Sequence, residues 1–219
     1  MKLSVIIVAA GSSQRMGFDK LLADLAGKPV LQRSIEAFTN CPEVSEIIVV
    51  CPKDRYDALD IRPSEPTITR VDGGQDRHDS VAAGIACLQP DANYVAVHDG
   101  ARPLITVQQI SKVFNSAIEH NAATSARPVT ETIKRISADG FVREPVSRDH
   151  LWLMETPQIF KAELLKKAYK LVQQNHERVT DEVSAMELIH CKTCVVANEQ
   201  ANPKITYPED ITLAEKMIS

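Results

Sequence analysis

The sequence predicts an α/β fold, with a mostly parallel sheet flanked by helices, in one domain that spans residues 1–219. Two observations carry this prediction. Short apolar runs alternate along the chain with segments whose apolar residues recur at helical spacing. Several of these runs are apolar at consecutive positions, as is typical of strands buried on both faces of a parallel sheet. A chain of 219 residues also fits a single hydrophobic core.

The apolar runs give the expected strands, and the segments between them give the helices. The strands are expected over residues 3–8, 47–51, 68–71, 94–98, 122–128 and 194–197. Apolar residues three and four positions apart predict amphipathic helices over residues 30–38, 81–88, 110–117 and 164–172. A further helix is expected over residues 183–189, with Thr180 as its N-cap and acidic residues in its first turn.

Residues 130–150 interrupt this alternation and predict a β-hairpin arm. Within them, two extended runs flank Asp139-Gly140, a dipeptide that is typical of hairpin turns. Polar and apolar residues fall on both faces of the hairpin, so neither face is clearly a core face. The segment is expected to be either a solvent-exposed ribbon or a projecting arm that pairs with another subunit.

Composition excludes several function classes. The net charge of −4 gives no general attraction to nucleic acid or to an anionic membrane. No segment approaches the roughly 18 apolar residues of a membrane span. The N-terminus lacks the features of a signal peptide, and the five scattered cysteines suit a reducing compartment, so the protein is expected to be cytoplasmic. Cys191 and Cys194 lack a second cysteine pair, which argues against a zinc or redox site.

The loop after the first expected strand points most directly to chemistry. Ligands of open α/β sheets bind beyond the carboxyl ends of the strands. Gly11 gives this loop a flexible backbone whose N–H groups can turn toward phosphate oxygens, and Arg15 and Lys20 add two cations. The spacing of Gly11 and Gly17 matches neither a P-loop nor a dinucleotide-binding fingerprint. The loop is expected to bind a polyphosphate. The alternative is a solvated turn with two ordinary surface cations.

Polar residues follow other expected strands in the same way. They lie at residues 72–77, at residues 98–103 and around Lys204. Asp99 is interpreted as a ligand-binding group, and the alternative is that its carboxylate caps a helix or stabilises a turn. His98 is expected to be a packed residue at a strand end rather than a catalytic base.

Several segments together carry a resemblance to a known family. Residues Ala9 to Lys20 resemble the signature loop of sugar-phosphate nucleotidyltransferases. The later matching segments are Val71-Asp72-Gly73-Gly74 with Ser80, Val97-His98-Asp99-Gly100-Ala101-Arg102-Pro103, Thr132-Ile133-Lys134-Arg135, Thr156-Pro157-Gln158, Thr180-Asp181-Glu182 and Lys204-Ile205-Thr206. In order and spacing they resemble the family of 2-C-methyl-D-erythritol 4-phosphate cytidylyltransferases of the non-mevalonate isoprenoid pathway. The chain departs from the family pattern at Gln75, at Gly100 and at residues 12–14, which bears on the substrate more than on the reaction.

The resemblance implies a Rossmann-like fold of the nucleotide-diphospho-sugar transferase type and a role for each matching residue. The residues that it places in catalysis are Arg15, Lys20, Arg148 and Lys204. Those that it places against CTP are Ala9, Ala10, Gly11, Gly74 and Ser80. Those that it places on the acceptor side are Asp99, Arg102, Thr132, Thr156 and Thr180. The capping role expected of Thr180 would by itself account for that residue.

The resemblance also implies the reaction and the partners. A phosphate oxygen of methylerythritol phosphate would attack the α-phosphorus of CTP, and pyrophosphate would leave without a covalent enzyme intermediate. A Mg²⁺ ion would act mainly through the CTP phosphates, and its protein ligands are not identified. The family implies a homodimer formed through the hairpin arm, in which Arg148 reaches the site of the partner. The alternatives are a ribitol-5-phosphate cytidylyltransferase and a non-catalytic module that binds CTP; the preference for cytosine rests on the resemblance alone.

Overall fold

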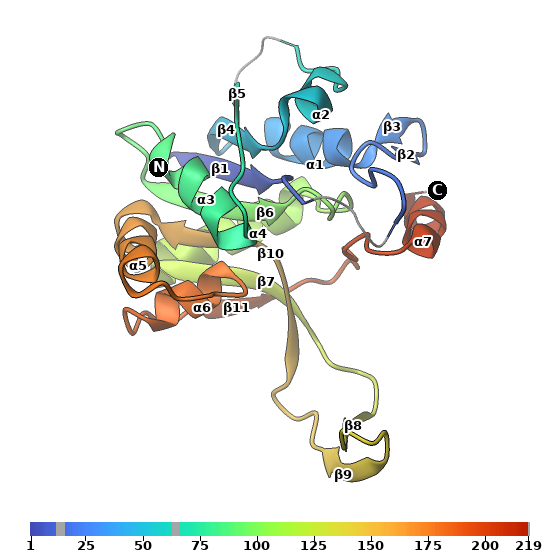
Figure 1. Ribbon diagram of the computed structural model, residues 1–219. Helices are drawn as coiled ribbons and strands as arrows, with labels where there is room; N and C mark the ends of the chain where they lie inside the picture. The colour runs from blue at the N-terminus through green and yellow to red at the C-terminus, as the bar shows by residue number, and fades with distance from the viewer. Residues whose placement is uncertain (12–15, 63–65, 219) are drawn as a thin grey trace.

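A seven-stranded sheet forms the centre of the computed structural model, which describes residues 1–11, 16–62 and 66–218 (Figure 1). Its strands, in spatial order, are β11 (Cys194–Ala197), β7 (Ala122–Pro128), β10 (Trp152–Lys161), β6 (Tyr94–Asp99), β1 (Leu3–Val8), β4 (Val44–Val50) and β5 (Thr67–Val71). Strand β10 is antiparallel to β6 and to β7, and the other neighbouring strands are parallel. The predicted α/β fold with a mostly parallel sheet is confirmed.

Helices cover both faces of the sheet. One face carries α1 (Val30–Thr39) and α4 (Val107–His120), and the other carries α3 (Arg77–Ala86), α5 (Ala162–Asn175) and α6 (Glu182–Glu187). Besides the two strands of the hairpin described below, the remaining described elements are β2 (Asp24–Leu25), β3 (Lys28–Pro29), α2 (Lys53–Asp57) and α7 (Pro208–Ile218). Across the described ranges, the helices are too short or too polar to cross a lipid bilayer.

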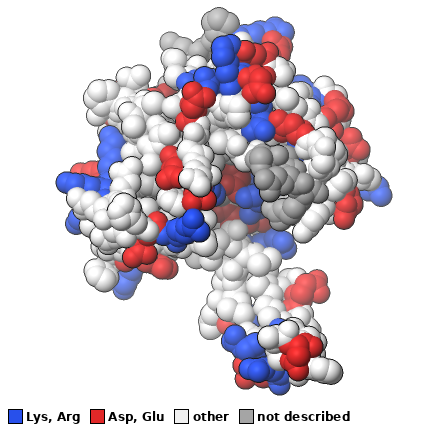
Figure 2. Space-filling view, in the orientation of Figure 1, with Lys and Arg blue, Asp and Glu red and all other residues white. Residues whose placement is uncertain are grey.

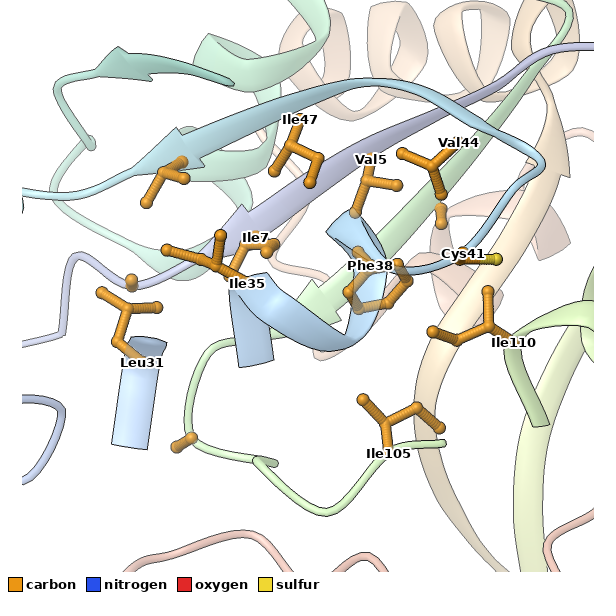
Figure 3. Packing of buried hydrophobic residues seen from close by; sticks show 14 of the residues in the cluster. Val5, Ile7, Leu31, Ile35, Phe38, Cys41, Val44, Ile47, Ile105 and Ile110 are labelled. Carbon is orange, nitrogen blue, oxygen red and sulfur yellow. The ribbon is translucent and has the colours of Figure 1, made fainter. Parts of the chain in front are cut away.

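The alternation of side chains along each strand divides the core into two layers. Val5 and Ile7 of β1 pack with Phe38 and Ile110 on the side of α1 and α4 (Figure 3). Ile6, between them in the sequence, belongs to the opposite layer beneath α3 and α5. Successive side chains of a strand point to opposite faces, so a strand that is covered on both faces must be apolar at consecutive positions. This explains the uninterrupted apolar run of β1.

The strand boundaries mostly agree with the predictions, and one strand of the central sheet was not predicted. Strands β1, β7 and β11 have the predicted bounds, whereas β4 begins three residues earlier than expected and ends one residue earlier, at Val50. Strand β10 lies in the middle of the sheet although it contains Pro157, which cannot donate to a ladder hydrogen bond. Its pairing with β7 is irregular between Met154 and Gln158, which accommodates the proline.

The start of α6 corrects one prediction. Asp181, rather than Thr180, is the N-cap, and its carboxylate accepts the backbone N–H of Ser184 at 3.0 Å. Asp181 has an extended backbone and directly precedes the first helical residue, so its side chain reaches the free N–H groups of the first turn. Thr180 lies one residue too early for this role and is exposed.

The predicted hairpin is present and projects from the body of the molecule (Figure 1). It pairs β8 (Ile133–Ile136) with β9 (Val142–Val146), and the outer parts of β7 and β10 connect it to the sheet. Gly140 has a φ of +89° in the turn, a conformation that glycine adopts without a steric penalty. Large apolar side chains are exposed along this arm and its base, namely Ile136, Phe141, Val142, Leu151, Trp152, Leu153 and Met154.

Candidate active site

A cleft of about 640 Å³ lies beyond the carboxyl ends of the central strands. The chain leaves β1 for β4 and β5 on one side and returns as β6 on the other, so the order of strands reverses at β1. Such a reversal opens a crevice at the strand ends. The described residues that line the cleft are Val8, Ala9, Ala10, Gly11, Met16, Lys20, Leu21, Gly74, Gln75, Asp76, Arg77, Ser80, Asp99, Ala101, Lys204 and Thr206.

The five residues predicted to bind CTP all line this cleft. They are Ala9, Ala10, Gly11, Gly74 and Ser80. The loop after β1 and the loop before α3 are in close contact, because a Cβ atom at residue 73 would lie 2.3 Å from the Cβ of Ala10. Only glycine fits at that position. The hydroxyl of Ser80 accepts the N–H of Gly74 at 3.2 Å, which fixes the second loop against the helix.

Both predicted catalytic lysines line the cleft. The Nζ of Lys20 donates to the carbonyl of Ile205 at 2.7 Å, and the Nζ of Lys204 lies 2.8 Å from the carboxylate of Asp99. The backbone N–H of Ile205 in turn donates to the carbonyl of Ala101 at 2.8 Å. This bond holds the segment that carries Lys204 beside the loop after β6. Residues far apart in the sequence thereby contribute to one site.

Asp99 is the centre of a cluster of cations at the cleft. Its carboxylate is 2.8 Å from Lys204, 3.2 Å from Arg77 and 3.8 Å from Arg102. Burial alone would raise the pKa of Asp99, but the nearby charges of Arg77 and Lys204 outweigh burial and hold the pKa well below its usual range. Asp99 is therefore ionised at neutral pH and binds cations rather than capping a helix.

The sequence placed Arg77 in a polar segment that follows an expected strand but assigned it no role in the site. The guanidinium donates to both carboxylate oxygens of Glu182, at 2.7 and 3.0 Å, and the hydroxyl of Tyr169 donates to the same carboxylate at 2.9 Å. Burial would lower the pKa of Arg77, but Glu182 and Asp99 raise it. Arg77 was missed because the sequence shows only an arginine after a glycine-containing loop. Its two acidic partners are 22 and 105 residues away.

Arg102 and Thr156 lie behind the cleft rather than among the residues that line it. Arg102 donates to the carbonyl of Asn202 at 2.9 Å, and burial lowers the pKa of this arginine. The hydroxyl of Thr156 accepts the backbone N–H of Asp99 at 3.1 Å. In this structure both residues hold the segment around Asp99 in place.

His98 is a packed residue, as the sequence predicts. Its ring is fully buried, and its centroid lies 4.9 Å from that of Phe38. One ring nitrogen is 3.1 Å from the carbonyl of Arg102, and the other is 3.0 Å from the hydroxyl of Thr156. Burial lowers the pKa of His98 to about 4. The ring is therefore neutral and bound on both sides by protein groups.

Three other predicted site residues, all of them described, are not among the residues that line the cleft of their own chain. Thr132 and Arg148 are exposed on the arm, where Arg148 donates to the carbonyl of Thr130. Thr180 is exposed near the start of α6. Arg15 lies outside the described residues.

The candidate metal ligands in and near the cleft are carboxylates and one histidine. Of the described residues that line it, Asp76 and Asp99 are acidic, and Asp99 already contacts three cations. Ligand atoms of Asp76, His78 and Asp79 lie within 4.8 Å of one another. Asp76 and Asp79 also form the capping box that begins α3, so these carboxylates have a structural role.

Comparisons with known proteins agree on one family. The family model for 2-C-methyl-D-erythritol 4-phosphate cytidylyltransferase matches residues 3–219. A curated relative of that name from Pelotomaculum thermopropionicum is 37% identical over 224 residues, which cover 99% of this chain and 94% of the relative. The chloroplastic relative of that name from Oryza sativa subsp. japonica is 34% identical and covers 99% and 74% of the two chains.

Solved structures give the same result. The crystal structure of 4-diphosphocytidyl-2C-methyl-D-erythritol synthase from Anaerococcus prevotii superposes with a TM-score of 0.86 at 30% identity and covers 99% of this chain and 96% of its own. The 2-C-methyl-D-erythritol 4-phosphate cytidylyltransferase from Francisella tularensis superposes with a TM-score of 0.85 at 28% identity and covers 99% and 100% of the two chains. This chain therefore belongs to the 2-C-methyl-D-erythritol 4-phosphate cytidylyltransferase family.

Proposed function

We propose that the enzyme transfers CMP from CTP to 2-C-methyl-D-erythritol 4-phosphate, releasing pyrophosphate and forming 4-diphosphocytidyl-2-C-methyl-D-erythritol for isoprenoid precursor synthesis. Membership of the family supports this activity. The structural observation that carries it is the convergence of Lys20, Arg77 and Lys204, from three separate segments, on one cleft. A triphosphate and a phosphorylated acceptor repel each other. Fixed cations between them offset that repulsion and stabilise the charge that develops during transfer.

The reaction that fits this cleft is a direct displacement. An oxygen of the acceptor phosphate attacks the α-phosphorus of CTP, and the bond to the pyrophosphate oxygen breaks. The acceptor is already anionic and needs no general base, which agrees with the buried, neutral state of His98. Catalysis then consists of holding the two anions in line and neutralising their charge.

On the CTP side, the support comes from backbone groups and lysine. Ala9, Ala10 and Gly11 follow β1 directly, and among the described residues beyond its chain neighbours no atom lies within 4 Å of the position of a Cβ at Gly11. This space allows the backbone to approach phosphate oxygens closely. Lys20 and Arg15 stabilise the charge of the triphosphate, and Gly74 and Ser80 hold the nucleoside end.

On the acceptor side, we assign the polyol to the surroundings of Asp99. Its carboxylate accepts hydrogen bonds from hydroxyl groups, and Lys204 binds the acceptor phosphate. Arg102 and Thr156, which hold the segment of Asp99, position this carboxylate. Thr132 and Arg148 are exposed on the arm and complete the site when a second subunit brings its arm to the cleft, and Thr180, exposed before α6, is a further residue on the acceptor side.

The reaction would also use Mg²⁺, which would act mainly through the CTP phosphates. Mg²⁺ commonly keeps several waters and takes only one or two protein carboxylates at such sites. Asp76 lines the cleft and suits this ion better than Asp99, whose carboxylate is occupied by cations. When bound, Mg²⁺ neutralises charge on the phosphates. Chelation of the metal should abolish turnover, and added Mg²⁺ should restore it.

The arm supports a homodimer. Its apolar side chains are exposed, and Phe141 and Val142 at the tip are 70% and 64% exposed. Figure 2 shows mainly uncharged atoms along the stalk between the body and the charged tip. A second copy would cover these side chains and bring Arg148 of one chain to the cleft of the other.

The five free cysteines support a reducing compartment, and we propose the cytoplasm. Burial raises the pKa of Cys41 to about 12 and that of Cys51 to about 11, so these two thiols stay protonated. Protonated, buried thiols are unreactive and behave as small apolar groups in the core.

A pyrophosphate-release assay tests the function. With CTP and Mg²⁺, methylerythritol phosphate should support rapid release, and ribitol 5-phosphate should support much slower release. A preference for ribitol 5-phosphate would overturn the substrate and leave the reaction class intact. If calorimetry shows CTP binding but neither acceptor gives pyrophosphate, the protein is a nucleotide-binding module rather than a transferase.

A further inference from the structure

Arg55 contacts both ends of the loop that follows β1. It belongs to α2, which begins three residues after the end of β4, and its side chain is buried. Strands β1 and β4 are parallel, with Val8 opposite Val50, so their carboxyl ends adjoin and α2 lies beside this loop. The guanidinium donates to the carbonyl of Ala9, to the carbonyl of Gly11 at 3.2 Å and, through Nε, to the carboxylate of Asp19 at 2.7 Å.

The first two contacts orient backbone dipoles at the edge of the cleft. In a trans peptide the C=O and N–H groups point in opposite directions. Because Arg55 binds the carbonyl of Ala9, the N–H of Ala10 points away from Arg55, and Ala10 is a residue that lines the cleft. The carbonyl of Gly11 is likewise directed to the guanidinium. Neither oxygen then repels a phosphate, and an N–H is left to face it.

The third contact fixes the chain beside Lys20. Asp19 binds Arg55 with one carboxylate oxygen, and the other accepts the backbone N–H of Leu21 at 3.0 Å. The backbone is therefore held on both sides of Lys20, whose Nζ reaches the cleft. One buried guanidinium thus sets the position of the backbone amides and of the lysine at the same site.

We propose that Arg55 is a positioning residue that sets the phosphate-binding side of the cleft, although it is not itself among the residues that line the cleft. The inference deepens the proposed function and rests on it. Its ligand class is the triphosphate of CTP rather than the acceptor, since the groups that Arg55 orients belong to residues 9–11 and 19–21.

Arginine is required because three acceptors lie around the side chain. Its planar guanidinium carries five N–H donors in a fixed arrangement, whereas lysine offers one flexible ammonium group. Lysine retains the charge and can reach Asp19 or a carbonyl, but it cannot hold all three. Arg55→Lys therefore separates the loss of orientation from the loss of charge.

The test compares Arg55→Lys and Arg55→Met with Arg33→Met. Arg33 donates to the carbonyls of Leu25 and Ala26, at 2.6 and 2.7 Å, in a turn outside the cleft, and so it is a matched control. Both Arg55 variants should weaken CTP binding in calorimetry and lower kcat/KM for CTP by roughly 10- to 100-fold, since a small misplacement of binding groups costs about that much. KM for the acceptor should change less than twofold. Arg33→Met should change neither.

Two further readouts separate positioning from general stability. Hydrogen exchange of the amides of residues 9–11 and 19–21 should accelerate in both Arg55 variants, while the centre of the sheet stays protected. Asp19→Asn keeps the carbonyl contacts and should give a smaller loss of CTP affinity than Arg55→Met. If Arg55→Met does not fold, Arg55→Lys and Asp19→Asn decide the question.

Specific results would overturn the inference. One is CTP affinity and kcat/KM in Arg55→Lys within twofold of wild type. Another is an equal rise in KM for CTP and for the acceptor, which indicates a merely structural role. If the wild type itself releases no pyrophosphate, the proposed function fails, and CTP affinity and hydrogen exchange alone then judge the role of Arg55.

Discussion

The cleft and the arm use charged residues in opposite ways. In the cleft, the side chains of Asp99 and Glu182 are 11% and 0% exposed, and both bind Arg77. On the arm, Arg135 and Glu144 pair at 2.8 Å, but their side chains are 65% and 60% exposed. A buried pair loses several kcal/mol when one partner is removed, whereas an exposed pair contributes about 0–1 kcal/mol.

This difference shows which parts of the site a single chain can hold in place by its own contacts. The cleft cations are held by contacts within the chain, so their arrangement exists without a partner. The arm has no comparable layer of buried side chains around Thr132 and Arg148. We infer that folding of one chain determines the arrangement of the cleft residues, whereas association with a second chain determines the position of the arm residues.

The largest effect should come from Asp99→Asn. This change leaves Arg77, Arg102 and Lys204 close together without their shared carboxylate. Breaking a buried ionic cluster by removing one member costs about 3–5 kcal/mol. Urea unfolding should show a loss of this size, whereas Glu144→Gln on the arm should change the free energy of unfolding by less than about 0.5 kcal/mol. Equal effects of the two variants would remove the distinction between the regions.

The next largest effect should come from Lys20→Ala, and it should appear in turnover. Loss of one fixed donor to the developing charge lowers kcat by roughly 10²- to 10³-fold. Single-turnover kinetics with CTP and methylerythritol phosphate measure this directly. Lys112→Ala, which removes an exposed lysine paired with Glu199, is the control and should leave kcat unchanged. A Lys20 variant with a near-normal rate would exclude Lys20 from catalysis.

The sequence predicted the fold better than it predicted the site, for a physical reason. The strands with consecutive apolar residues, such as β1 and β6, were found because burial shows in their composition. Strand β10 was missed, because Glu155, Thr156, Pro157 and Gln158 interrupt its apolar pattern while tertiary partners satisfy its polar groups.

The site was predicted where residues follow strands and missed where side chains reach inward from helices. Lys20, Asp99 and Lys204 come together as expected, because the carboxyl ends of parallel strands share one edge. In the sequence alone, Arg55 and Arg77 look like ordinary exposed arginines near the start of a helix. Their roles depend on acceptors 22 to 105 residues away, and such partners have no local signal.

The pH dependence of stability sharpens the comparison further. The pKa of His98 is lowered by burial from 6.5 to about 4, so the unfolded chain binds this proton more tightly. The contribution of neutral His98 is complete above about pH 6.5 and is lost as the pH falls toward 4, by at most about 3 kcal/mol. Below about pH 4 the ionised Asp99 adds to the loss, because its pKa is also lowered.

Unfolding measured between pH 7 and pH 4 checks this dependence. His98→Gln should flatten the decline between pH 6.5 and pH 4. An exposed control, His120→Gln, should follow the wild-type curve. A His98→Gln curve parallel to that of the wild type would show that the buried imidazole does not set this decline.

A substitution on the arm should give the smallest change in the stability of the monomer and still weaken association of the two chains. Phe141→Ser alters an exposed side chain, so the free energy of unfolding of the body should move by less than about 0.5 kcal/mol. Sedimentation should nevertheless show a weaker dimer, and activity should fall on dilution. An unchanged dimer with unchanged activity would exclude this tip from the interface.

Complementation tests whether the arm supplies Arg148 to the partner. An equal mixture of Arg148→Ala and Arg15→Ala chains contains heterodimers with one intact site, so a two-fold dimer should regain about a quarter of wild-type activity. Heterodimers without any recovery would place Arg148 in the site of its own chain.

The most direct test of the central claim is a crystal structure with CTP and Mg²⁺ bound. The triphosphate should lie in the cleft, with its oxygens about 3 Å from the Nζ of Lys20 and from the N–H of Ala10, and with Lys204 and Asp99 facing the space for the acceptor. CTP bound elsewhere, with Lys20 and Lys204 turned away from its phosphates, would contradict the account.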